Sequence, residues 1–195
     1  QEQQSYIDLS STLRNPDVWN SKSPVGNDNM LKGATVLTGN YNLNNEYQVD
    51  ISDEAKMGPC VLNINAMDIA GNGTFNGLVI DNIGNQPLVI NVDLAGYSGT
   101  YSQNFAVEFV KDGQALSNAE ASVYAGTSIL WNFYDSSNTT DGTYSGNIDL
   151  AKPLIGSVLA PKASIKAGSN VDGTIIANKI STSGETHRSD FMLPS

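Results

Sequence analysis

The chain has little charge, few aromatic residues and almost no reactive side chains. Of its 195 residues, 15% are charged and 8% are aromatic, and Cys60 and His187 are the only cysteine and the only histidine. A single cysteine excludes an intramolecular disulfide framework and any zinc site built from cysteines. We expect Cys60 to be buried as a small apolar residue, because the largely apolar run of residues 61–64 follows it.

Basic residues are also scarce, which bears on the partners that the chain can have. There are 20 Asp and Glu against 10 Lys and Arg, a formal net charge of −10. A phosphate backbone would be repelled by this charge, so we predict no nucleic-acid partner. No apolar run approaches the roughly 20 residues of a membrane-spanning helix, so we expect no membrane insertion by this segment.

The shortage of titratable groups argues against catalysis. A catalytic triad would have to use His187, and no Gly-x-Ser-x-Gly motif supplies its nucleophile. Asp53 and Glu54 are adjacent, so on a strand they would face opposite ways and could not form a glycosidase pair. Residues 135–142 are rich in oxygen ligands but lack the full spacing and the final glutamate of an EF-hand. We predict no enzyme activity, no bound metal and no cofactor.

The chain does contain a near-repeat close to its C-terminus. Residues 156–162 read Gly-Ser-Val-Leu-Ala-Pro-Lys, and residues 173–179 read Gly-Thr-Ile-Ile-Ala-Asn-Lys. A period of this kind with short β-branched runs is typical of stacked coils of parallel strand. We therefore predict an all-β fold with one or two short helices, a right-handed parallel β-solenoid. A β-sandwich is the alternative, because Asn63 and Asn91 alternate with apolar neighbours.

Turn residues divide most of the chain into short apolar segments. We predict strands over residues 34–37, 47–51, 60–64, 68–69, 78–80, 88–94, 105–110, 128–133, 157–159, 164–165 and 174–176. A helix is predicted within residues 5–20, where Pro16 limits its length. A second is predicted within residues 117–125, with Ser117 as N-cap, Glu120 completing a capping box and Gly126 as the stop. We expect one domain over residues 1–195, with a helix and loop over 1–31 and the solenoid over 32–195.

Five segments of the chain resemble the choice-of-anchor A domain of bacterial surface proteins. They are Val-Ile-Asn-Val at 89–92, Ile-Leu-Trp-Asn-Phe at 129–133, the two copies of the near-repeat, and Gly-Glu-Thr-His at 184–187. Residues 97–126 look like an insertion, and the family's N-terminal portion is not apparent over residues 1–60. The resemblance implies a secreted adhesive domain, attached to a bacterial cell wall or envelope, with a solenoid similar to ice-binding β-helices. The resemblance implies no catalytic residues in this chain.

The motif residues that we assign to structure are Trp131, Phe133, Gly156, Gly173, Glu185 and His187. Trp131 and Phe133 alternate along a strand, so both are expected to point into the core. Glu185 and His187 are expected to close the last coil with polar contacts. The candidate ligand-binding residues are Tyr97, Tyr101, Tyr134 and Tyr144, because tyrosine offers both stacking and hydrogen bonding to glycans or matrix proteins.

These observations favour a non-enzymatic adhesive module of a bacterial cell-surface protein. Its expected partner is a host glycan, glycoprotein or extracellular-matrix protein, bound by a monomeric domain within a longer chain. A structural stalk spacer and an ice-binding solenoid are alternatives, and an enzyme acting on surface polysaccharide is a further one. An ice-binding face typically repeats threonine along one side, and Thr38, Thr100, Thr127 and Thr174 are not in such a register.

Overall fold

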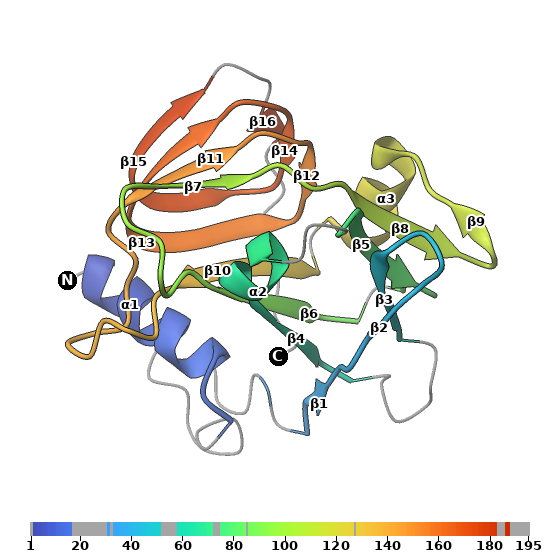
Figure 1. Ribbon diagram of the computed structural model, residues 1–195, viewed down its shortest axis with the longest axis horizontal. Helices are drawn as coiled ribbons and strands as arrows, with labels where there is room; N and C mark the ends of the chain where they lie inside the picture. Colours follow the sequence, from blue (N-terminus) through green and yellow to red (C-terminus); the bar gives the residue numbers. More distant parts are fainter. Residues whose placement is uncertain are drawn as a thin grey trace.

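The computed structural model describes residues 2–16, 31, 33–51, 58–71, 75–84, 86–126, 128–182 and 186–187. Strands dominate these residues, and every pairing in the largest sheet is parallel. The chain winds into coils that stack on one another, as in a parallel β-solenoid (Figure 1). The sandwich alternative is therefore wrong, because a sandwich packs two antiparallel sheets. Within these residues no helix is long and apolar enough to cross a bilayer.

The first face of the solenoid stacks its strands in the order of the chain. These strands are β1 (Thr35–Val36), β4 (Cys60–Asn65), β6 (Leu88–Asp93), β10 (Ile129–Tyr134) and the first parts of β13 (Ser157–Ala167) and β15 (Ile175–Thr182). Each coil thus lies on the one before it, as the near-repeat predicts. The solenoid prediction is confirmed.

The second face begins where β13 and β15 shift their pairing register between Ala160 and Ser164. Pro161 lies in this irregularity, the kind of place in a sheet that tolerates proline. The second face contains the second parts of β13 and β15 together with β11 (Asn147–Leu150) and β7 (Thr100–Gln103). The third face contains β3 (Glu46–Asp50), β5 (Gly77–Asp81) and β8 (Val107–Lys111), then β12 (Leu154–Ile155), β14 (Val171–Asp172) and β16 (Thr186–His187).

Additional elements depart from the regular coil. β2 (Asn40–Tyr41) pairs antiparallel with β3, and α2 (Ala66–Gly71) follows β4 directly. β9 (Gln114–Ala115) and α3 (Asn118–Ala125) form an excursion between β8 and β10, which projects from the stack in Figure 1. The insertion-like stretch of residues 97–126 therefore contains regular solenoid strands, β7 and β8, as well as this excursion.

The core lies between the faces and is filled by the inward side chains of successive coils. Trp131 and Phe133 are 0% and 1% exposed, which confirms that both point inward. Trp131 Nε1 donates a hydrogen bond to the carbonyl oxygen of Ile155 at 2.9 Å, so its one polar atom is satisfied. Cys60 is buried with no exposed surface, as expected.

α1 (Glu2–Leu13) covers the outer side of the first face (Figure 1). Beneath it Val61, Val89, Leu130 and Leu159 form an aliphatic row that packs with Leu13. All five side chains are at most 5% exposed. The helix therefore shields apolar surface that would otherwise face water on the outside of the stack.

An asparagine ladder lies beside this row. Asn63, Asn91 and Asn132 are register partners on β4, β6 and β10. Asn132 Nδ2 donates to Asn91 Oδ1 at 2.9 Å, and Asn91 Nδ2 donates to Asn63 Oδ1 at 3.0 Å. α1 completes the ladder, because Asn91 also donates to the carbonyl oxygen of Leu13 and Asn132 to that of Ser10. The alternation that suggested a sandwich thus reflects an outward face covered by a helix.

The structure corrects some of the predicted elements. Residues 68–69 are not a strand but lie in α2, where the side-chain oxygen of Asn65 accepts a hydrogen bond from the Met67 N–H. The strands predicted over 157–159 and 164–165 are one strand, β13. The first helix is α1, Glu2–Leu13, and the part of the predicted helix from residue 17 onward lies outside the described residues.

The predicted helix over residues 117–125 is confirmed as α3, including its capping box. The Ser117 hydroxyl accepts from the Glu120 N–H at 3.2 Å, and Glu120 Oε1 accepts from the Ser117 N–H at 3.0 Å. The Ser117→Ala variant is expected to lose about 1 kcal/mol of stability, because a helix N–H loses its partner. Urea unfolding would measure this loss. Ser122→Ala, within the same helix, is the control and should be near neutral; equal losses in both variants would contradict the capping role.

Candidate functional site

The second face is open to solvent on its outer side, and its outward side chains form two rows. We call these rows the open polar face. The first row contains Thr100, Asn147, Ser164 and Lys179, and the second contains Ser102, Asp149, Lys166 and Ser181. Ser164 and Asp149 are half-buried and the other six residues are exposed.

The rows arise from the two-residue period of a strand. Between them Tyr101, Ile148 and Ile165 point inward and are at most 4% exposed. Neighbouring strands lie about 4.8 Å apart, so each row presents a new side chain at that spacing along the solenoid axis. The register of the coils therefore turns short polar triplets into a continuous surface.

A shallow hollow of about 520 Å³ lies on the open polar face. Its walls include Thr100 and Asn147 from one row, and Asp149 and Lys166 from the other. Asp149 and Lys166 are direct register partners on β11 and β13. Ile148, Ile165 and Ile180 also line the hollow, and Ile180 is 48% exposed. The hollow thus combines an apolar floor with hydroxyl, amide, carboxylate and ammonium groups, in a volume typical of small-ligand sites, which run from roughly 300 to 1,000 Å³. Such chemistry suits a ligand that has both polar groups and an apolar face.

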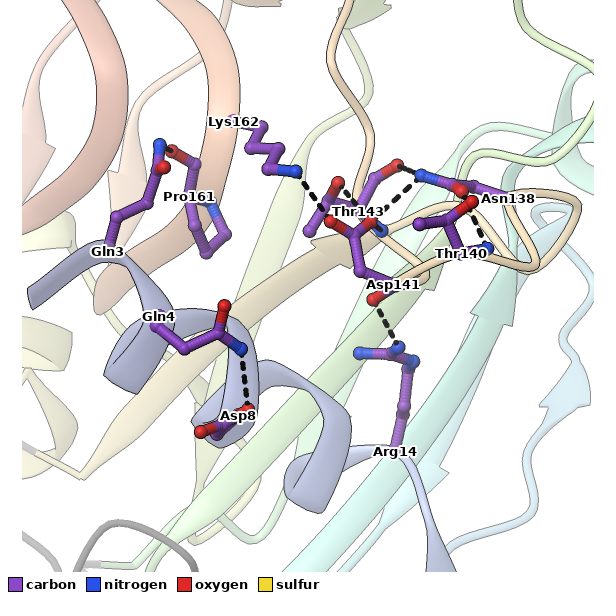
Figure 2. Close-up of polar contacts among 10 residues, drawn as sticks. All are labelled: Gln3, Gln4, Asp8, Arg14, Asn138, Thr140, Asp141, Thr143, Pro161 and Lys162. Atoms are coloured by element: carbon purple, nitrogen blue, oxygen red, sulfur yellow. Dashed lines mark hydrogen bonds and ion pairs between the residues drawn. The ribbon is translucent and has the colours of Figure 1, made fainter. Parts of the chain in front are cut away.

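Residues 135–143 form a polar loop that Asp141 holds together (Figure 2). Asp141 Oδ1 accepts hydrogen bonds from Asn138 Nδ2 at 2.9 Å and from the Thr143 hydroxyl at 2.7 Å. Lys162 of β13 forms an ion pair with Asp141 Oδ2 at 2.6 Å, and Arg14 of α1 donates to the Asp141 carbonyl. The loop that resembles a calcium loop is thus organised by hydrogen bonds. Within the described ranges no three His, Cys, Asp or Glu side chains gather as potential metal ligands.

The pKa of Asp141 lies well below its ordinary value of 3.8, first because Lys162 and then because Thr143 donate hydrogen bonds to the carboxylate. A lowered folded-state pKa means that this stabilisation is fully present above pH 3.8 and is lost as the pH falls further. Asp141→Asn is expected to cost about 1 kcal/mol at pH 7, a modest value because the Lys162 side chain is 40% exposed.

The measurement is urea unfolding of the wild type and Asp141→Asn at pH 7 and at several values below 3.8. The difference should shrink in acid. Lys162→Met and the double variant complete a cycle in which the two losses should not add. A difference that is independent of pH, or strictly additive losses, would contradict the ion-pair explanation.

The structure places the four candidate tyrosines mostly in or against the core. Tyr101 and Tyr144 are each 4% exposed, so their rings are not available to a ligand outside the protein. Burial raises the pKa of the Tyr101 hydroxyl, which lies 3.5 Å from Gln103 Oε1. Tyr97 and Tyr134 are half-buried, and Arg14 lies 4.9 Å from the centre of the Tyr134 ring. The structure does not gather the four rings into one external site.

The motif glycines stand at the corner that leads into the first face. Gly156 has φ +113°, and a Cβ there would lie 2.7 Å from the carbonyl oxygen of Ile129 on the preceding coil. A Cβ on Gly173 would meet the backbone of Gly156 in the same way.

Glu185 lies outside the described residues, and the backbone of His187 belongs to β16, which pairs with β14 on the third face.

Sequence reasoning did not find the open polar face. The sequence pattern that corresponds to this face is a set of polar-apolar-polar triplets at 100–102, 147–149, 164–166 and 179–181. Each triplet is too short to stand out, and the distances between them along the chain are irregular. Only the register of the coils shows that they lie side by side.

The chain was compared with known families, curated proteins and solved structures. The family model described as "Putative Ice-binding-like adhesive domain" matches residues 2–188, from α1 through β16. The comparisons with curated proteins and with solved structures find no match. Because the family model covers nearly all of the solenoid, the chain belongs to the family of ice-binding-like adhesive domains.

Proposed function

We propose that the chain is a non-enzymatic adhesive module that binds a glycan, a glycoprotein or an extracellular-matrix protein through the open polar face. The observation that carries the proposal is the uncovered pair of in-register polar rows around a hollow of about 520 Å³. The outer side of the first face, by contrast, is closed by α1. Membership of an adhesive family supports a function exerted by a surface.

The resemblance to the choice-of-anchor A domain supports display on a bacterial envelope. In this proposal the domain is secreted and reaches its ligand as part of a longer surface protein. The ligand contacts the outward side chains of β7, β11, β13 and β15, whose backbones are fixed by the stacked coils. A rigid scaffold of this kind limits the conformational entropy lost on binding.

A glycan array and a panel of immobilised matrix proteins, probed with the isolated chain, test the proposal. We expect at least one ligand to bind, and the double variant Lys166→Ser/Lys179→Ser to weaken that binding about tenfold. Lys111→Ser on β8 is the matched control and should bind as the wild type does. Loss of binding in the control alone would place the ligand elsewhere on the domain. If the chain binds nothing on the glycan array and nothing on the matrix-protein panel, a stalk spacer is favoured.

Ice binding is the second candidate, because regular rows on a flat parallel sheet are the geometry that an ice surface requires. The open polar face has only one threonine in its rows, Thr100, and it carries Lys166 and Lys179, whose long charged chains interrupt a flat array. Thermal hysteresis, measured at millimolar protein concentration, decides between ice binding and adhesion. A clear freezing-point gap that the double lysine variant leaves intact would favour ice over a glycan.

A further inference from the structure

A row of aromatic rings crosses successive coils at the corner between the second and third faces. Tyr41 and Tyr47 are partners on β2 and β3, with ring centres 5.4 Å apart. The Phe75 ring lies 6.4 Å from that of Tyr41 and 5.3 Å from that of Phe105. Phe75 and Phe105 stand just before β5 and β8, which pair with each other on neighbouring coils. We call these four residues the aromatic corner.

The aromatic corner keeps part of its apolar surface in water. Tyr41 is 48% exposed, and Tyr47, Phe75 and Phe105 are half-buried. Phe133, in the core, is only 1% exposed, so the fold can enclose an aromatic ring fully where packing alone is required. A row of one exposed and three partly exposed rings leaves a continuous apolar strip in water, which is typical of a binding surface.

Polar side chains surround the rings. A hollow of about 390 Å³ beside Phe75 and Phe105 is also lined by Asn76, Asn104 and Lys152. All three of these polar residues are exposed. A lipid or an apolar peptide segment would leave these amides and the ammonium group facing hydrocarbon, which is unfavourable. The composition instead matches a ligand with one apolar face and a polar rim.

We propose that the aromatic corner binds a carbohydrate chain. The C–H face of a sugar ring stacks on Phe75, Phe105 and Tyr41, while the hydroxyl groups at its rim bond to the Asn104 amide and the Lys152 ammonium group. β7 carries Thr100 and Ser102 of the open polar face and leads directly into Asn104 and Phe105, so one coil serves both surfaces. This inference rests on the proposed adhesive function and goes beyond it, because it assigns a carbohydrate ligand to a second surface beside the open polar face.

The first experiment maps binding with probes of known composition. Chitohexaose, cellohexaose and a hyaluronan hexasaccharide are titrated separately into the isotopically labelled chain, and its NMR spectrum is followed. We expect at least one hexasaccharide to shift the ring signals of Phe75, Phe105 and Tyr41 and the side-chain amide of Asn104. Shifts confined to the open polar face, or no binding of any of the three at millimolar concentration, would overturn the inference.

The second experiment removes single rings while keeping apolar volume. Tyr41→Leu and Phe105→Leu are each expected to raise the Kd of the bound hexasaccharide about tenfold, the loss of one stacking contact. Tyr124→Leu on α3 is the matched control, because Tyr124 is 44% exposed and lies outside the corner. Unchanged affinity in both corner variants overturns the inference, and so does an equal loss in the control. Thermal unfolding of each variant shows whether the fold is retained. If Phe105→Leu does not fold, the affinity of Tyr41→Leu, which changes a more exposed residue, decides the test alone.

The two proposals fail in different ways. A chain that binds matrix proteins but none of the hexasaccharides keeps the adhesive function and loses the carbohydrate assignment. A chain that binds neither the hexasaccharides nor any ligand on the array or the protein panel loses both.

Discussion

The Gly156→Ala variant is expected to lose about 4 kcal/mol of unfolding free energy. Two effects contribute: φ +113° is strained for a residue with a side chain, and the new Cβ would lie 2.7 Å from the carbonyl oxygen of Ile129. Each effect is worth roughly 1–3 kcal/mol. The same glycine opens the first copy of the near-repeat, so its role is to let one coil approach the next.

Three other glycines separate the two contributions. Gly173→Ala adds only the clash with the backbone of Gly156, and we expect a loss of about 2 kcal/mol. Gly99→Ala adds only strain, because φ is +93° with open space around the Cβ, and should cost about 1 kcal/mol. Gly58→Ala has neither problem and should be neutral or slightly stabilising.

Urea unfolding of the four variants, followed by circular dichroism, gives the comparison. A loss in Gly156→Ala no larger than that in Gly99→Ala would show that the coils separate easily to admit a methyl group. A loss in Gly58→Ala similar to that in Gly156→Ala would contradict the explanation altogether.

The Asn132→Leu variant is expected to lose about 3 kcal/mol, although leucine has a similar size. Asn132 is 0% exposed and takes part in three hydrogen bonds: its amide donates to Asn91 Oδ1 and to the Ser10 carbonyl, and its oxygen accepts from the Ser10 hydroxyl at 2.7 Å. The variant leaves buried polar atoms of Asn91 and Ser10 without these bonds, and each such atom costs about 1–3 kcal/mol.

Asn63→Leu is the matched control, because Asn63 is the exposed end of the same ladder. Its loss should be smaller, about 1 kcal/mol, because only one hydrogen bond is removed and Asn91 Nδ2 keeps its bond to the Leu13 carbonyl oxygen. Thermal and urea unfolding of both variants measure the difference. Equal losses, or a neutral Asn132→Leu, would show that the ladder does not stabilise the contact between α1 and the first face.

The sequence predicted the parts of the fold that local chemistry determines. The near-repeat predicted stacked parallel coils, the capping residues predicted α3, and alternation placed Trp131 and Phe133 in the core. It did not predict that β13 continues through Pro161, because a local reading treats proline as a break. At Pro161 the pairing between β13 and β15 shifts register, so no regular strand-to-strand hydrogen bond requires the N–H that proline lacks.

The surfaces could not be predicted because they depend on register between coils. Thr100, Asn147 and Ser164 are neighbours only after corners of different length have aligned their strands. The aromatic corner likewise joins Tyr41 to Phe105 across coils. The candidate tyrosines were chosen for their stacking and hydrogen-bonding chemistry, but Tyr101 and Tyr144 are enclosed by the core. The polar triplet around Tyr101 is too short to show which way its ring points, and Tyr144 lies in no strand, so alternation gives no direction for either ring.

The position of α1 has a consequence for how the domain unfolds. A stack in which each coil touches only its neighbours can fray from either end, one coil at a time. Here Gln3 Nε2 donates to the carbonyl oxygen of Pro161 on β13, while the carbonyl oxygen of Leu13 accepts from Asn91 on β6. The helix thus bridges the coils from β6 to β13, so that opening one of them disturbs the others, and we expect these coils to unfold together.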